Sequence, residues 1–148
     1  MKPFDPRSVI FAKHAQHVVL VHFPIALCLV SIGFDFFAQW KKSRALAEAA
    51  YYNLLVAAIS TIPVIATGLL AWHFQLEGQR LKGTLRQHLL LGSMAAGMIW
   101  VVWSVHHRAH RNPQRTLPSW RFAIELATAA LVAVTAHLGG VLSGVNGP

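Results

Sequence analysis

The sequence predicts an all-α membrane protein in which four antiparallel transmembrane helices form an up-down bundle. Of the 148 residues, 55% are hydrophobic and only 12% are charged. A helix needs about 20 mostly apolar residues to cross a bilayer, and four intervals of that length lack Asp, Glu, Lys and Arg: 14–34, 49–75, 87–107 and 126–148. Residues 18–34 and 54–72 are apolar on every side, which is typical of membrane helices and not of a soluble bundle.

Each uncharged interval predicts one helix, and aromatic residues set the expected ends. Trp40, Trp72, Trp103 and Trp120 fall near these ends, where amphipathic rings prefer the membrane interface. The expected spans are 18–40, 50–72, 87–105 and 120–139. Since the spans and their short connections use nearly the whole chain, we expect one transmembrane domain over residues 1–148. No internal repeat is evident.

The distribution of Lys and Arg predicts the orientation. Antiparallel helices place the leader, the 72–86 connection and the tail on one side, called face A, and the other two connections on the opposite side, face B. Face B carries seven of the 13 Lys and Arg residues: Lys41, Lys42, Arg44, Arg108, Arg111, Arg115 and Arg121. The positive-inside rule therefore favours a cytoplasmic face B and non-cytoplasmic termini. Because these charges lie in connections, the expected partner is the lipid bilayer and not nucleic acid.

Three histidines inside the spans are the first candidates for a functional site: His22, His88 and His137. Their distances from Lys41, Arg108 and Arg121, at about 1.5 Å per residue, place them within about 6 Å of one another along the membrane normal. Each shares a helix face with small residues, which let another helix or a flat ligand come close. Polar side chains within spans usually face the interior and serve function.

Three uses of this histidine layer remain open. Neutral imidazole is a common axial ligand of haem iron, so two of the three could hold haem b. Three imidazoles could also bind a bare transition metal such as copper, zinc or iron. Alternatively, they only form hydrogen bonds between helices and bind no cofactor. His17 and His73 lie nearer the headgroups and are secondary candidates.

A second polar layer near face B includes Asp35 and Glu125, also secondary candidates. The simpler interpretation is structural, with Glu125 paired to Arg121 at i, i+4 and Asp35 reaching toward Lys41 or Lys42. The functional interpretation is proton uptake or a contact with quinone.

No soluble-enzyme motif is present, so any redox chemistry would belong to a bound cofactor. Whether the protein is an enzyme is open, and a non-catalytic subunit or electron carrier of a respiratory-type complex is favoured. The leading hypothesis is a b-type cytochrome-like electron-transfer subunit with haem near the non-cytoplasmic face. Its partners would be other membrane-complex subunits or a periplasmic cytochrome, with quinone as a further candidate. The alternative is a structural or assembly subunit without its own cofactor.

Four motifs occur in a specific order along the chain. They are His17-Val-Val-Leu-Val-His22-Phe-Pro24, Thr67-Gly-Leu-Leu-Ala-Trp72, His88 at the start of the third span, and His137-Leu-Gly-Gly140. Together they resemble the bacterial membrane family known as domain of unknown function 2231, over nearly the whole chain. The resemblance implies a four-helix protein of the bacterial inner membrane, with relatives associated with cytochrome-like or respiratory components.

The same resemblance identifies His22, His88 and His137 as motif positions. The chain departs from the family pattern at three places. Val18 replaces a proline, Ala71 replaces an acid before Trp72, and Ser143-Gly144 replaces a hydrophobic-aromatic pair. Any role of that acid is therefore not expected in this chain.

Overall fold

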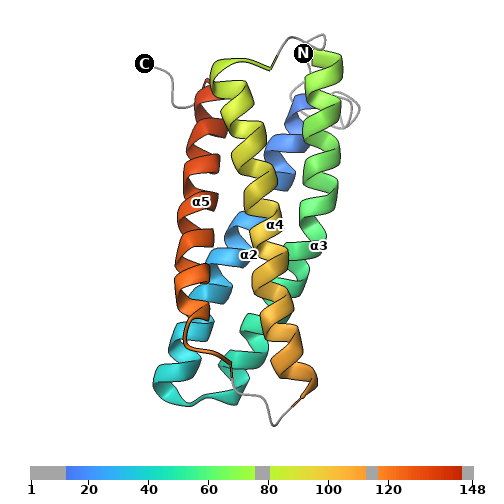
Figure 1. Cartoon of the computed structure of the whole chain (residues 1–148). Helices are drawn as coiled ribbons and strands as arrows, with labels where there is room; N and C mark the ends of the chain where they lie inside the picture. Colours follow the sequence, from blue (N-terminus) through green and yellow to red (C-terminus); the bar gives the residue numbers. More distant parts are fainter. Residues whose placement is uncertain (1–12, 76–80, 113–116, 145–148) are drawn as a thin grey trace.

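The computed structural model describes residues 13–75, 81–112 and 117–144, and all regular structure in these ranges is helical. Four helices run antiparallel side by side (Figure 1). They are α2 (Lys13–Lys41), α3 (Arg44–Gln75), α4 (Gly83–Arg111) and α5 (Arg121–Leu142). Face A is the upper end in Figure 1, where α2 and α4 begin. All four helices are long and apolar enough to cross a membrane, which confirms the predicted fold class.

The helices extend beyond the expected spans, most clearly at face B. There α3 begins at Arg44 and not at residue 50, and α4 ends at Arg111 and not at residue 105. Hydropathy marks the part of a helix that lies in lipid, whereas the backbone hydrogen bonds continue into the interface. Basic residues in the last turn of α4 favour this extension because they complement the partial negative charge of the helix end.

A tight turn at face B joins α2 to α3. Lys42 adopts a positive φ of 49°, and the Ser43 N–H donates to the carbonyl of Ala38 at 3.0 Å. The Ser43 hydroxyl then accepts a hydrogen bond from the Leu46 N–H at 3.4 Å, as an N-cap does for the next helix. These contacts end one helix and start the other within two residues, so α2 and α3 form a hairpin.

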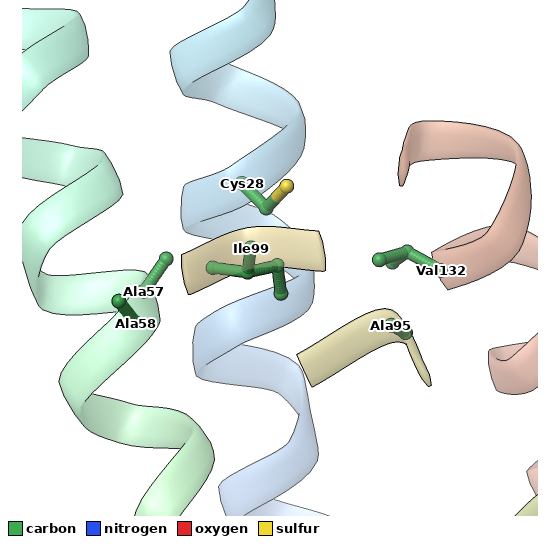
Figure 2. Close-up of a cluster of buried hydrophobic side chains, with 6 residues drawn as sticks. All are labelled: Cys28, Ala57, Ala58, Ala95, Ile99 and Val132. Carbon is green, nitrogen blue, oxygen red and sulfur yellow. The ribbon is translucent and has the colours of Figure 1, made fainter. Parts of the chain in front are cut away.

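The core lies at mid-bundle and toward face B. Cys28, Ala57, Ala58, Ala95, Ile99 and Val132 form one buried cluster, with members from all four helices (Figure 2). Small side chains dominate it, as is typical of close packing between membrane helices. Toward face A, residues 16–23, 83–94 and 133–144 contain no buried side chain. On α3, Ala71 is buried near this end. Among the described residues, the face-A half thus has fewer buried side chains than the rest of the bundle.

The hairpin formed by α2 and α3 corresponds to the hairpin formed by α4 and α5 at a constant numbering offset of 71. Asp35 and His106 are one such pair, and both are buried. Eight pairs at this offset have both members buried: Pro24 and Ala95, Cys28 and Ile99, Ser31 and Val102, Asp35 and His106, Ala50 and Arg121, Leu54 and Glu125, Ala57 and Thr128, and Thr61 and Val132. The two hairpins thus bury the same positions.

The correspondence concerns buried positions and not residue types, since equivalent positions carry different chemistry, such as Leu54 and Glu125. It is therefore consistent with a sequence in which no repeat is evident. Both hairpins begin at face A and bury equivalent positions, so we infer an approximate two-fold axis along the bundle that relates them. Asp35 and His106 are equivalent positions about this axis.

The orientation expected from Lys and Arg is not tested by this fold. Four of the 13 residues counted, Lys2, Arg7, Arg80 and Arg115, lie outside the described residues.

We predict that Ile99→Ala lowers the free energy of unfolding by about 2–5 kcal/mol, since it opens a cavity in the buried cluster. Ile99 is 3% exposed, whereas Val101 on the same helix is 45% exposed. Val101→Ala is therefore the control and should have a much smaller effect. Unfolding by a denaturing detergent in mixed micelles measures both, and equal losses would contradict the assignment of the core.

Candidate functional site

Four ionisable side chains form a buried cluster near face B. Asp35 comes from α2, His106 from α4, and Arg121 and Glu125 from the first two turns of α5. They are between 1% and 4% exposed. Charged side chains are this deeply buried only when they are paired. We call this set the ionic cluster.

Arg121 connects the cluster across the bundle. Its Nε donates to Asp35 Oδ2 at 2.8 Å, and its Nη1 donates to the Pro118 carbonyl at 3.2 Å. Its Nη2 also lies 2.8 Å from Asp35 Oδ2, but without the alignment of a hydrogen bond. The guanidinium stacks on the Phe122 ring at 4.0 Å. It is therefore fixed by contacts from two helices.

Glu125 is the second carboxylate of the cluster and lies between two basic groups. Its Oε1 is 2.9 Å from His106 Nε2 and 3.9 Å from Arg121 Nε. With both carboxylates ionised and His106 neutral, the cluster carries one net negative charge. One added proton on the His106–Glu125 pair brings the net charge of the cluster to zero.

Several polar atoms at the cluster have no hydrogen-bond partner in the described part of the chain. They are Asp35 Oδ1, Arg121 Nη2 and Glu125 Oε2, together with Trp103 Nε1 nearby in sequence on α4. A buried polar atom without a hydrogen-bond partner lowers the stability of the folded protein. The cluster can therefore accept a further small species, such as a proton, a water molecule or a cation.

Sequence reasoning found only part of this cluster. The Arg121–Glu125 pair is confirmed by the 3.9 Å contact. The predicted reach of Asp35 toward Lys41 or Lys42 is wrong, because Asp35 is 1% exposed and binds Arg121. His106 was missed entirely, and nothing in the sequence pattern pointed to it, because its equivalence with Asp35 is visible only in the structure.

The histidines of the face-A half are held within the two hairpins. His17 Nδ1 lies 3.1 Å from the Val64 carbonyl, and His88 Nδ1 lies 3.1 Å from the Thr135 carbonyl. These contacts are equivalent at the offset of 71. A Cβ on Gly68 would lie 2.9 Å from His17 Cε1, and a Cβ on Gly139 would lie 3.1 Å from His88 Cε1. The two glycines of the motifs thus make room for the two rings.

The other predicted histidines have more open surroundings. His22 is exposed, and its Nδ1 lies 2.6 Å from the Val18 carbonyl. His137 and His73 are exposed as well, and the His73 ring meets Phe74 edge-on. Among the described residues, the group of three or more potential ligands within 4.8 Å is Asp35, His106 and Glu125. The structure does not gather His22, His88 and His137 into such a group.

Two more histidines beside the ionic cluster were also not predicted. His107 Nδ1 lies 2.9 Å from the Tyr51 hydroxyl, and the His107 ring stacks on Trp103 at 4.9 Å. His110 stacks on the Tyr51 ring at 4.1 Å. These contacts tie α3 to α4 at face B and extend the region of polar contacts toward the membrane surface.

Comparison with known proteins identifies the family. A family model described as "Predicted membrane protein (DUF2231)" matches residues 13–147. The chain therefore belongs to this family, as the motifs predicted. No curated protein and no solved structure matches the chain.

We predict that Arg121→Gln lowers the free energy of unfolding by about 3–5 kcal/mol, because it leaves Asp35 as an uncompensated buried charge. Arg44→Gln is the matched control, since the Arg44 side chain is 93% exposed in its pair with Glu48. Exposed pairs contribute little. Detergent unfolding compares the two variants, and an Arg121→Gln protein as stable as the control would contradict this account.

We also predict that Gly68→Ala displaces the His17 ring and lowers the melting temperature. The new methyl group would lie 2.9 Å from His17 Cε1, and the ring is held by its bond to Val64. Gly139→Ala should have a smaller effect in the same direction. Gly97→Ala is the control, because no atom lies within 4 Å of its added Cβ. A melting temperature equal to that of Gly97→Ala would show that the ring moves at no cost.

Proposed function

We propose that this member of the DUF2231 family is a membrane-embedded electron-transfer subunit that holds haem b with histidines of its face-A half. The observation that carries the proposal is the hydrogen bonding of His88 and His22. In each, Nδ1 contacts a backbone carbonyl, of Thr135 or Val18, and a carbonyl can only accept. The Nδ1 atoms therefore carry protons, and each ring in its neutral form keeps the Nε2 lone pair that iron requires.

The packing of the face-A half supports the same proposal. Residues 16–23, 83–94 and 133–144 contain no buried side chain, so these parts of α2, α4 and α5 leave helix surface accessible beside the histidines. A flat macrocycle needs uncovered helix faces with small residues, such as those at Gly92 and Ala133. Bound haem would supply the change of redox state. The chain would supply axial imidazoles, orientation and exclusion of water.

The second histidine that would hold the haem is His22 or His137, with His17 and His73 as the further candidates. The setting that fits this function is the bacterial inner membrane, with face B cytoplasmic and both termini non-cytoplasmic. The electron partners would be a periplasmic cytochrome and a quinone or another membrane subunit. A bare transition metal at His22, His88 and His137 is the alternative cofactor.

A different class of function also has a specific observation in its favour. The uncovered face-A half exposes large apolar side chains, including Leu90, Met94 and Val134. Another membrane subunit could pack on this surface. The protein would then be a structural or assembly subunit without its own cofactor.

We predict that the protein purified from membranes shows the Soret and α bands of a b-type cytochrome in a reduced-minus-oxidised spectrum. His88→Ala should abolish them, because the proposal makes His88 one axial ligand. His22→Ala and His137→Ala identify the second ligand by loss or shift of the bands. His17→Ala and His73→Ala complete the series.

His110→Ala is the matched control, since this histidine lies at face B and stacks on Tyr51. It should leave the spectrum unchanged. A featureless spectrum from a folded protein with full haem supply would reject the haem proposal. Elemental analysis of the same sample then separates a bound metal from a structural subunit.

A further inference from the structure

The ionic cluster occupies the place where the two hairpins meet. Asp35 and His106 are equivalent at the offset of 71, and potential ligand atoms of Asp35, His106 and Glu125 all lie within 4.8 Å of one another. Equivalent positions that come this close must lie near the approximate two-fold axis. At the neighbouring pairs of equivalent positions, the first hairpin has Ala50 and Leu54 where the second has Arg121 and Glu125. Arg121 and Glu125 of the second hairpin therefore have no charged equivalents in the first hairpin.

The charge balance of the cluster depends on one proton. Arg121 provides a permanent positive charge, and its contacts at 2.8 Å assign it to Asp35. That pair is neutral as a unit. Glu125 is left with His106 at 2.9 Å, and this second pair is neutral only when it holds a proton. In a poorly solvated interior, an unbalanced charge is strongly disfavoured.

Among the ionisable side chains around the cluster, the His106–Glu125 pair is the one that can gain or lose a proton. The groups that reach this region from the four helices are Cys28 and Asp35 on α2, Tyr51 on α3, His106 and His107 on α4, and Arg121 and Glu125 on α5. Among the described residues, the buried charged or imidazole side chains are those of the ionic cluster alone. His107 is engaged with Tyr51 at 2.9 Å. Exposed cations such as Lys41 and Arg108 are solvated and screened.

A proton fits the cluster better than a divalent metal ion. A metal bound by Asp35, His106 and Glu125 would lie beside the guanidinium of Arg121, which is fixed on Asp35. The assembly would then carry one net positive charge, whereas a single proton gives a net charge of zero. The open positions at Asp35 Oδ1 and Glu125 Oε2 suit water molecules that deliver the proton.

The arrangement also indicates the side from which the proton comes. Toward the bundle centre, the polar residues Ser31 and Thr128 follow the cluster, but both hydroxyls donate to their own helix backbone. Beyond them lies the apolar cluster of Cys28, Ile99 and Val132. Toward face B, the helix ends are near, because Arg121 begins α5 and His106 stands five residues before the end of α4. The shorter path for a proton therefore leads to face B.

We propose that the ionic cluster is a proton-binding site on the approximate two-fold axis. The His106–Glu125 pair takes up and releases one proton from face B, and the Asp35–Arg121 pair holds it in place as a fixed counter-charge. Intramembrane ionisable residues commonly mark proton relays. This proposal does not depend on whether the face-A histidines hold haem.

The test is a pH titration of the full-length protein in lipid nanodiscs. Nitrogen NMR of labelled histidine follows the His106 ring, assigned with His106→Gln, and infrared spectra of carbon-13-labelled glutamate follow the Glu125 carboxyl. The expected result is one step in which both signals change at the same pH. In Glu125→Gln the His106 signal should no longer change at that pH, whereas the control Glu48→Gln should keep the step.

Other outcomes would overturn the proposal. A His106 signal that is constant over the whole pH range of the folded protein would show a permanently fixed proton. Two separate steps for His106 and Glu125 would show independent groups. If Glu125→Gln does not fold, Glu125→Asp and the wild-type titration decide the matter, since the common step is measured on the wild type. One equivalent of zinc could also shift the His106 signal in the wild type and leave it unchanged in Asp35→Asn. That result would show that the cluster binds a metal ion and not a proton.

Discussion

The ion pair between Asp35 and Arg121 connects the first of the four described helices to the last, and the rest of the site is arranged around it. Buried charges are tolerated only with well-placed partners, so this contact fixes both the register of α5 against α2 and the rotation of each helix. It also determines where Glu125 lies, one turn after Arg121, and therefore which side chain meets His106. A single contact thus specifies the geometry of the whole ionic cluster.

Sequence reasoning was sufficient for the fold because charge and hydropathy report directly on which residues lie in lipid. It was insufficient for the ionic cluster because partners on different helices are chosen by helix rotation, which hydropathy does not report. Arg121 was counted as a connection charge, since it stands at the end of an apolar segment. Asp35 was assigned the nearest cations in sequence, although its partner lies 86 residues away.

The histidine layer was predicted from depth and from the small residues on each histidine's helix face, and neither reveals which atoms a ring contacts. His88 and His17 emerge as equivalent residues because each meets a carbonyl and a glycine on the partner helix. The close approach of these rings also accounts for Gly68 and Gly139 in the Thr67-Gly and His137-Leu-Gly-Gly140 motifs.

The concentration of core residues away from face A has a mechanical consequence. The mid-bundle cluster that includes Cys28 and Ile99 is the last set of buried side chains that joins all four helices on the way to face A. From Cys28 to His17, and equally from Ile99 to His88, the helix runs 11 residues, or about 17 Å. A tilt of one degree between the hairpins at this cluster would move each far end by about 0.3 Å. The spacing between the two imidazoles would therefore respond to how the hairpins pack at mid-bundle.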